Sequence, residues 1–339
     1  MLNLPMQVLQ ALAAERLQER GARRFVSGTT LAARLNVTRA AVWKAVSELR
    51  ELGTPIEAVP RSGYRLAMAS SPLDAASVIA LLPPAVAARL RQGECAGAIA
   101  STNGALLERG APPPGRFDFL TAEYQSAGRG RRGRSWLAPP GGAICLSWSW
   151  SFDALASQVG ALSLAVGVAA LRALAQCGIG GVQLKWPNDL VTPRGKLGGI
   201  LIEMRAEVAG PTHVVVGIGL NVALGAALQS RIGELGQPAC DLAQLAGLPP
   251  PRNRLVAALL GQGVDALQVF GERGLAPFLA EYAAADALRD RPVRLSGAHT
   301  GFDSGIARGL DADGALRIEH AGAIHRIIAG EISIRADGA

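Results

Sequence analysis

Residues 123–134 read E-Y-Q-S-A-G-R-G-R-R-G-R, and this run decides which fold the rest of the chain is assigned. No hydrophobic period passes through residues 127–134, so they are predicted to form a loop. Glycine lets the backbone take positive φ and approach a ligand closely, and arginine keeps its charge and pairs with carboxylate or phosphate. We therefore expect a cationic loop that closes over an anionic ligand, with Arg129, Arg131, Arg132 and Arg134 as its charges.

The loop taken by itself leaves other interpretations open. It reads equally as a solvated basic surface loop, or as a disordered RNA-binding segment rich in Arg and Gly. Residues 119–124 before it and 144–150 after it read as strands, so it joins packed elements and the disordered interpretation is disfavoured. The glycine spacing is close to a dinucleotide-binding G-x-G-x-x-G, but no helical pattern follows, which disfavours a Rossmann fold.

Length and charge indicate a globular protein of two or three domains with an anionic partner. The chain has 339 residues, of which 49% are hydrophobic, and this excludes a disordered chain. Its 34 Lys and Arg against 27 Asp and Glu give a formal charge of +7. Residues 1–68 hold ten basic residues and five glutamates, which predicts nucleic-acid binding at this end of the chain.

Cysteine usage and apolar segments predict a reduced, cytoplasmic protein. The four cysteines are far apart without a C-x-x-C spacing, and the four histidines show no metal-ligand spacing, so no metal fixed by a protein motif is expected. The N-terminus has no signal-peptide pattern. Residues 154–171 carry no charge but are rich in alanine and contain glycine, serine and glutamine, which favours a core helix over a membrane span.

Residues 1–68 predict a winged helix-turn-helix domain that binds DNA. Residues 4–22 read as a first helix, a second is capped by Thr29 or Thr30 and ends at Leu35, and Asn36 takes the left-handed turn. A small helical protein-interaction module is the alternative interpretation.

The predicted third helix supplies the basic outer face of this domain. Thr38 caps it and Gly53 ends it, and the helical spacing turns Val42, Val46 and Leu49 inward. Two short strands, 56–59 and 63–66, flank a P-R-S-G turn and form the wing. The residues expected to contact DNA are Thr38, Arg39, Trp43, Lys44 and Arg61.

Residues 68–72 read as a linker, and a second unit over residues 73–285 follows. Helices are expected over 74–82 and 85–90, then a strand at 97–100. The run S-T-N at 101–103 precedes a helix over 104–109. Its hydroxyls and amide fit two roles, capping that helix or hydrogen-bonding a polar ring, and the residues alone do not separate them.

Four segments predict the centre of this unit. Residues 144–150 alternate apolar and small side chains, as in a half-buried strand, and 182–186 form a strand ending in K-W-P-N-D with Lys185 at its end. Residues 196–203 and 214–221 read as paired central strands. Glycines within them remove side chains where a ligand would lie against the sheet, namely Gly198, Gly199, Gly217 and Gly219.

The C-terminal part predicts helices followed by a small barrel. Helices are expected over 241–245, 253–271 and 275–283. Short strands follow, and about fifty residues of such strands over 286–339 suggest an SH3-like barrel. Their expected bounds are 292–296, 302–310, 315–320, 323–328 and 332–335.

Taken together, these motifs resemble bacterial biotin protein ligases of the bifunctional class, the biotin operon repressors. The resemblance spans nearly the whole chain, and its motifs occur in order and spacing: T-R-A-A-V-W-K at 38–44, S-T-N at 101–103, the 123–134 run, K-W-P-N-D-L at 185–190, K-L-G-G-I-L-I-E at 196–203, G-I-G-L-N at 217–221 and G-E-I-S at 330–333. It implies an α+β fold: a winged helix-turn-helix, a class II synthetase-like mixed-sheet domain and an SH3-like barrel.

The resemblance also assigns roles to residues of this chain. Lys185, Arg129 and Arg131 become catalytic. The implied biotin-binding residues are Ser101, Thr102, Asn103, Gln125, Arg129, Gly130, Arg131 and Lys185. The implied ATP-binding residues are Arg131, Arg132, Asn188 and Asn221. Two positions depart from the family pattern: Ala100 replaces an acidic residue, and Ile327 stands near a position that is aromatic in some members.

The implied activity is ATP-dependent ligation of biotin to a lysine of a biotin carboxyl carrier domain through biotinyl-5'-AMP, assisted by Mg²⁺. Fixed positive charge lets the biotin carboxylate meet the ATP phosphate, and no protein nucleophile is required. Operator DNA and a second copy of the chain, when adenylate is bound, are the further expected partners. A lipoate-type ligase and a ligand-sensing transcription factor without ligase activity are the competing functions.

Overall fold

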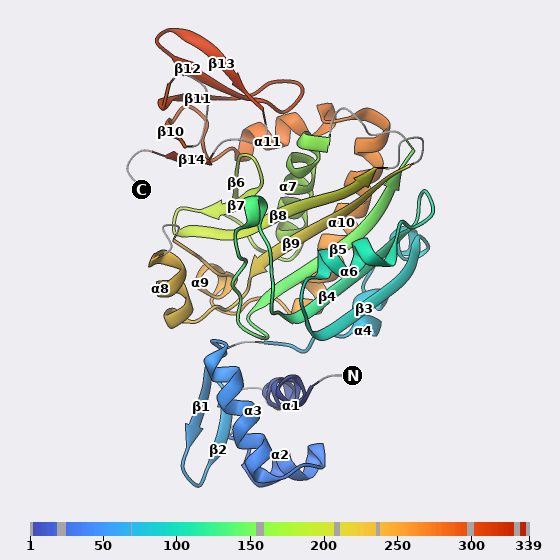
Figure 1. Ribbon diagram of the computed structural model, residues 1–339, viewed down its shortest axis with the longest axis vertical. Helices are drawn as coiled ribbons and strands as arrows, with labels where there is room; N and C mark the ends of the chain where they lie inside the picture. The colour runs from blue at the N-terminus through green and yellow to red at the C-terminus, as the bar shows by residue number, and fades with distance from the viewer. Residues whose placement is uncertain are drawn as a thin grey trace.

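The computed structural model describes residues 3–18, 25–68, 70–153, 159–206, 211–234, 238–296, 302–328 and 333–336. Within them the chain forms three sheets of two, seven and five strands, in that order along the sequence (Figure 1). The expected α+β class is confirmed. Parts of the predicted segments at 4–22, 154–171 and 330–333 lie outside the described residues.

The N-terminal unit is the predicted winged helix-turn-helix. It comprises α1 (Leu4–Gln18), α2 (Gly28–Leu35), α3 (Arg39–Glu51), β1 (Ile56–Val59) and β2 (Gly63–Leu66). Asn36 is left-handed at φ 53°, and the Thr38 hydroxyl accepts from Ala41 N as the cap of α3. The expected cap of α2 was wrong: Ser27 holds that place and accepts from Thr30 N, because its extended backbone directs the hydroxyl at the free N–H groups.

The central sheet has the order β3-β4-β5-β9-β8-β7-β6, in which β3 pairs parallel with β4 and the other pairs are antiparallel. The expected central pairing of 196–203 with 214–221 is confirmed as β8 against β9. The strands are β3 (Leu90–Ile99), β4 (Phe117–Gln125), β5 (Ala143–Phe152), β6 (Gln183–Lys185), β7 (Asp189–Thr192), β8 (Gly195–Ala206) and β9 (Thr212–Asn221).

Helices cover both faces of this sheet. On one face α7 (Val159–Gln176) and α10 (Arg252–Arg273) pack on each other and on β5 and β8, with Trp148 in the core between them. On the other face α6 (Thr102–Arg109) lies over β4, β5 and β9 (Figure 1). The strand expected at 144–150 is confirmed as part of β5, but its expected half-burial was wrong, because every residue of β5 is buried.

The remaining helices surround the sheet, and they differ from the sequence prediction in two places. The helix expected at 85–90 ends at Ala87, since Leu90 already starts β3 beside Phe117. One helix, α8, was not predicted. These helices are α4 (Ala75–Ala80), α5 (Pro84–Ala87), α8 (Ala226–Glu234), α9 (Leu242–Ala246) and α11 (Leu279–Ala285), with 3₁₀ turns η1 (Arg131–Gly133) and η2 (Ala276–Phe278).

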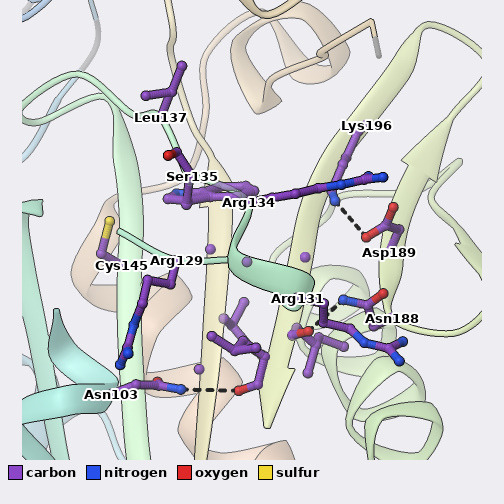
Figure 2. A pocket seen from close by; sticks show the side chains of 18 of the residues that line it. Asn103, Arg129, Arg131, Arg134, Ser135, Leu137, Cys145, Asn188, Asp189 and Lys196 are labelled. Carbon is purple, nitrogen blue, oxygen red and sulfur yellow. Dashed lines mark hydrogen bonds and ion pairs between the residues drawn. The ribbon is translucent and has the colours of Figure 1, made fainter. Parts of the chain in front are cut away.

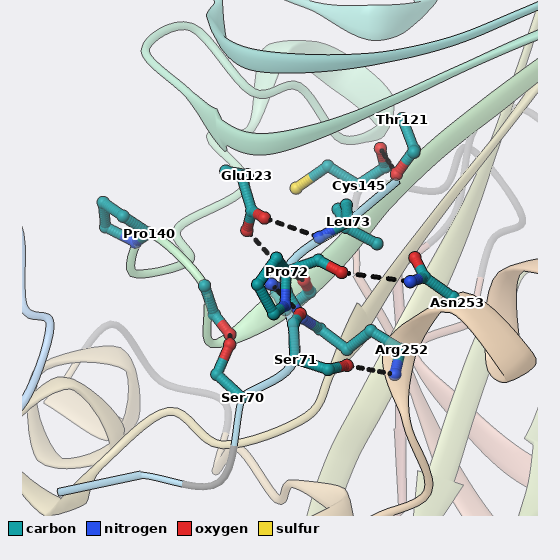
Figure 3. Close-up of polar contacts among 12 residues, drawn as sticks. Ser70, Ser71, Pro72, Leu73, Thr121, Glu123, Pro140, Cys145, Arg252 and Asn253 are labelled. Carbon is teal, nitrogen blue, oxygen red and sulfur yellow. Dashed lines mark hydrogen bonds and ion pairs between the residues drawn. The ribbon is translucent and has the colours of Figure 1, made fainter. Parts of the chain in front are cut away.

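The linker expected at 68–72 is fixed to the central unit rather than free. Arg252, at the start of α10, is 1% exposed and forms an ion pair of 2.7 Å with the buried Glu123 of β4. Arg252 also donates to the backbone oxygen of Ser71, and Glu123 accepts from Leu73 N at 2.9 Å (Figure 3). A buried pair needs both partners, so this contact fixes the path of the linker.

The winged helix also rests on the turn before β5. The Thr54 hydroxyl donates to Pro140 O at 3.1 Å. The Ser70 hydroxyl, whose residue is labelled in Figure 3, donates to Gly141 O at 2.8 Å. Gly141 has φ 75°, and a Cβ there would lie 3.2 Å from Leu9 of α1. The turn that leads from the Arg/Gly loop into β5 is thus in contact with the N-terminal unit.

The C-terminal unit is a five-stranded antiparallel sheet of order β13-β12-β11-β10-β14, as expected of a small SH3-like barrel. Trp186 joins it to the central sheet, since its Nε1 donates to Gly314 O at 3.1 Å. Among the described residues, no helix is both long and apolar enough to cross a membrane. The strands are β10 (Pro292–Ser296), β11 (Ser304–Leu310), β12 (Leu316–His320), β13 (Ala323–Ile327) and β14 (Ser333–Ala336).

Candidate active site

A cavity of about 740 Å³ opens on the α6 face of the central sheet, under the Arg/Gly loop (Figure 2). The structure brings every residue predicted for biotin or ATP to its walls. These are Ser101, Thr102, Asn103, Gln125, Arg129, Gly130, Arg131, Arg132, Lys185, Asn188 and Asn221. Residues more than 100 positions apart therefore meet in one site.

The α6 end of the cavity is a closed network of neutral polar groups. Ser101 caps α6 by accepting from Gly104 N at 3.3 Å. Gln125 Oε1 accepts from Thr102 N at 2.7 Å and from its hydroxyl at 3.0 Å. The Ser147 hydroxyl lies 2.7 Å from Thr102 Oγ1 and 2.5 Å from Asn103 Oδ1. Of the two roles left open for this run, capping of the helix is confirmed, and the cavity-lining position of Ser101, Thr102 and Asn103 leaves the ligand-binding role a prediction.

Glu203 of β8 supports this end and was missed from the sequence. Its Oε2 accepts from Asn103 Nδ2 at 2.8 Å, and its Oε1 lies 3.2 Å from Arg129 Nη2 of the loop. The residue does not line the cavity itself. Its only sequence signal was a lone acidic residue at the end of the K-L-G-G-I-L-I-E strand.

The glycines of β9 were expected to leave space for a ligand against the sheet. In the structure, neighbouring side chains occupy much of that space. A Cβ on Gly217 would lie 2.3 Å from Asn103 Oδ1, and one on Gly219 would lie 2.5 Å from the Trp136 ring. Both glycines still line the cavity. Trp136 was also missed, and its Nε1 is buried without a hydrogen-bond partner among the described residues.

The Arg/Gly loop is folded over the cavity as a short hairpin. Gly130 N donates to Arg134 O at 2.7 Å and Trp136 N to Gly128 O at 2.9 Å, which closes the loop around η1. Arg132 has φ 59° inside this turn. Burial and the neighbouring charge of Arg132 lower the pKa of the Arg131 guanidinium, whose side chain forms no ion pair with any described residue.

The opposite end of the cavity is charged. Lys185 ends β6 and lines this end next to Trp186 and Pro187. Lys196 forms a 2.6 Å ion pair with Asp189 (Figure 2). Lys185, Lys196 and Arg131 thus bring positive charge to this end of the cavity.

The two asparagines predicted for the nucleotide end also hold the backbone. Asn188 Nδ2 donates to Ile200 O at 2.7 Å, and Asn221 Nδ2 donates to Lys196 O and Cys240 O. Their amide nitrogens are thus engaged in shaping the cavity wall. Asn221 Oδ1 is buried with no partner among the described residues, so it is the acceptor left at this end.

The cavity has no resident metal centre among the described residues, where no group of three or more His, Cys, Asp or Glu side chains is placed to hold an ion. Asp189 is the acidic side chain in the described lining, and it pairs with Lys196. Magnesium keeps several waters and binds one or two carboxylates plus substrate phosphates. The donor set therefore fits Mg²⁺ that arrives on a nucleotide.

The remaining predicted positions lie outside the cavity. Ala100 is exposed, and its carbonyl accepts from Ala127 N at 2.9 Å. Ile327 is buried in the C-terminal sheet and does not line the cavity. The side chains expected to contact DNA are all exposed on α3 or in the β1–β2 turn: Thr38, Arg39, Trp43, Lys44 and Arg61.

Three domain models match the chain. Residues 104–221 match the Biotin/lipoate A/B protein ligase family, residues 16–65 an HTH domain, and residues 290–335 the Biotin protein ligase C terminal domain. The three matches follow the three sheets in chain order.

Whole-chain relatives carry the same pattern. The chain is 37% identical over 314 residues to the bifunctional ligase/repressor BirA of Salmonella typhimurium, covering 92% of this chain and 94% of that protein. It is 35% identical over 249 residues to the biotin–[acetyl-CoA-carboxylase] ligase of Mycobacterium tuberculosis, covering 71% and 88%. The biotin protein ligase of Aquifex aeolicus, solved with biotin and ATP, superposes with a TM-score of 0.61 at 25% identity, covering 73% of this chain and all of that one.

Proposed function

The chain belongs to the biotin protein ligase family, in its bifunctional ligase/repressor class, and from this premise we propose how its residues perform the two activities. It ligates biotin to a lysine of a carrier domain of a biotin-dependent carboxylase, through biotinyl-5'-AMP and with release of diphosphate. It also represses transcription through its winged helix. In this proposal residues 1–68 bind DNA, 73–285 carry the chemistry and 286–339 form the barrel beside it.

The α6 end holds the biotin ring. The ring system is neutral and polar, and Thr102, Asn103, Gln125 and Ser147 form a neutral network that is already hydrogen-bonded. Such a network does not have to reorganise when a ligand arrives, so little ordering cost opposes binding. Trp136 covers the ring from the loop side and offers its unpaired N–H.

The charged end activates the carboxylate. Attack of the biotin carboxylate on the ATP α-phosphate brings two anions together, and fixed positive charge in a dry site lowers that barrier. Lys185 and Arg131 supply this charge, with Arg132 toward the nucleotide. A bond forms between the carboxylate oxygen and the α-phosphorus, and the bond to diphosphate breaks. Asp189 is the carboxylate in the described cavity lining that would hold Mg²⁺ carried by the nucleotide. Once bound, the ion would offset the charge of the departing diphosphate.

The loop then protects the mixed anhydride until the acceptor arrives. Closing a site excludes water that would hydrolyse a reactive intermediate. The acceptor lysine amine attacks the acyl carbon, an amide forms, and AMP leaves with the bonding electrons. The protein supplies no nucleophile, and within the cavity lining the thiol of Cys145 is held protonated, since burial raises its pKa to about 12.

One observation carries this proposal: a single cavity joins the neutral α6 network, the arginine loop and Lys185. The test is incubation of the protein with ATP, labelled biotin and a purified carrier domain. We expect label on the carrier and equimolar AMP. An unlabelled carrier would sink the ligase proposal, and labelling by lipoate in place of biotin would favour the lipoate-type activity.

DNA binding and self-association complete the proposal. The exposed face of α3 enters the operator and Arg61 of the wing contacts the phosphates beside it. We expect Trp43→Ala and Arg61→Ala each to weaken operator binding by about 1–3 kcal/mol while ligation continues at the wild-type rate. A gel shift that the variants leave unchanged would refute this role of α3.

We propose that adenylate-loaded chains pair and that the protein is cytoplasmic, where carrier, ATP and operator are present together. Sedimentation of the protein with and without biotin and ATP checks the pairing, and the proposal expects the dimer to predominate when both are present. An unchanged monomer would refute it.

A further inference from the structure

Glu203 lies at the point where the loop meets the α6 wall. It projects from β8, outside the residues that line the cavity, and its side chain is 25% exposed. The same carboxylate contacts Asn103 of the wall and Arg129 of the loop. Any influence on a bound molecule therefore passes through these two neighbours.

The wall side of this contact is rigid. Asn103 is 4% exposed, its Oδ1 lies 2.5 Å from the Ser147 hydroxyl, and its Nδ2 donates to Glu203 at 2.8 Å and to Leu201 O at 3.3 Å. Gly217 lies directly beneath it, with no room for a Cβ. Because the amide is held on both sides, it fixes the position of the Glu203 carboxylate.

The loop side is weaker and exchangeable. The Arg129 side chain is 47% exposed, and its Nη2 lies 3.2 Å and 3.4 Å from the two Glu203 oxygens. A pair this exposed contributes little to global stability because water screens it. The position of this ion pair matters more than its strength, because it joins the loop to the sheet beneath the cavity.

Two of the four loop arginines, Arg129 and Arg131, therefore differ in charge balance. Arg129 has a carboxylate partner, whereas Arg131 is more deeply buried, has a lowered pKa because of that burial, and forms no ion pair with a described residue. A ligand anion gains most from the charge that lacks a partner. Arg131 is thus suited to bind the phosphate, and Arg129 is suited to hold the loop closed.

We propose that Glu203 is a positioning residue that fastens the closed loop through Arg129, and so sets how long the adenylate stays in the cavity between the two half-reactions. The inference deepens the proposed ligase function and rests on it. It assigns Glu203 a role in retention of the intermediate rather than in recognition of biotin. Loss of this contact frees the loop without removing any group that touches the ligand.

The test is the rate at which preformed biotinyl-5'-AMP leaves the protein, followed by chase with unlabelled ligand in the absence of carrier. We expect Glu203→Gln to release the adenylate about three- to fivefold faster, because the glutamine keeps an acceptor for Asn103 but removes the charge that holds Arg129. Biotin KM in the first half-reaction stays within twofold. Glu203→Asp, which keeps the charge, restores part of the retention.

A double-mutant cycle separates this role from a merely structural one. If Glu203 acts through Arg129, then Arg129→Gln with Glu203→Gln releases adenylate no faster than Arg129→Gln alone. Additive effects, or a raised biotin KM with unchanged release, would overturn the inference and leave Glu203 as support for Asn103 only. A wild-type protein that forms no adenylate would instead refute the proposed function itself.

Discussion

The two ends of the cavity differ in charge: one is lined by neutral hydrogen-bonded side chains and the other by charged ones. At the α6 end Thr102, Asn103, Gln125 and Ser147 satisfy one another before any ligand is present. At the other end Lys185 and Arg131 bring positive charge into a partly buried space where Lys196 is already paired with Asp189. Figure 2 shows both ends under one loop.

The difference teaches where binding and catalysis divide. A saturated neutral network favours a neutral ring and gains little when charge develops, so it contributes equally to ground and transition states. Preorganised positive charge in a partly buried site gains most as negative charge is brought together, so it lowers the barrier. We therefore expect changes at the α6 end to act on biotin affinity and changes at the charged end to act on the rate.

The strongest test of that division is Lys185→Ala. Loss of one preorganised charge costs about 10²–10³ in rate, so we expect adenylate formation to fall by at least this factor with the melting temperature nearly unchanged. Pyrophosphate release with biotin and ATP measures it. Lys196→Ala is the matched control, since Asp189 already offsets its charge, and it should lose about tenfold or less. Near-normal turnover of Lys185→Ala would refute its role.

A second test compares Arg129 with Arg131, two of the four arginines of the loop. Arg131→Ala should slow adenylate formation by about 10²-fold, because its partly buried guanidinium forms no ion pair with a described residue. Arg129→Ala should slow it by about tenfold or less, because Glu203 shares its charge. Single-turnover formation of biotinyl-5'-AMP gives both values. Equal losses in the two variants would break the distinction drawn between them.

The third test acts at the α6 end alone. Gly217→Ala places a Cβ 2.3 Å from Asn103 Oδ1, so the amide must move and the network opens. We expect the biotin KM to rise about tenfold, roughly 1.4 kcal/mol, with the KM for ATP unchanged. Gly180→Ala, where nothing lies within 4 Å of the added carbon, is the matched control. A rise in the ATP KM instead would show that the two ends are not separable.

The smallest expected effect concerns Cys145 beside the network. Burial raises the pKa of this thiol to about 12, so iodoacetamide should modify it slowly at pH 8 and faster only as the pH approaches that value. The pKa of the Cys145 thiol is higher in the folded protein than in the unfolded chain. The stability that the protonated thiol contributes is therefore complete below about pH 9 and is lost as the pH rises toward 12. Peptide mass spectrometry measures the modification. Rapid labelling of folded protein at pH 8 would contradict the assignment.

The sequence was informative where chemistry is local. The S-T-N run, the Arg/Gly loop and K-W-P-N-D each hold their cavity-lining residues within a few positions, and all of them meet in the cavity. The winged helix could be predicted for the same reason, because its caps and turn depend on neighbouring residues. The cap at Ser27 was missed because three nearby hydroxyl residues fit equally well until the backbone angles are known.

What could not be predicted depends on long-range partners. Asn103 and Glu203 are 100 positions apart, and Arg252 and Glu123 are more than 100 positions apart, so neither pair leaves a local pattern. Gly217 read as space for a ligand because the side chain that fills this space comes from α6. Helix α8 was missed because it is only nine residues long and has no buried residue, so its apolar pattern is short.

The central claim is that the neutral end holds the biotin ring and the charged end holds the phosphoryl group. A crystal structure of the protein with biotinyl-5'-AMP tests it most directly. We expect the ring within hydrogen-bond distance of Thr102 or Asn103, and the adenylate phosphate within 4 Å of Lys185 and Arg131, about the reach of an ion pair. An adenylate lying the other way round, or bound with both charges remote from its phosphate, would contradict the account.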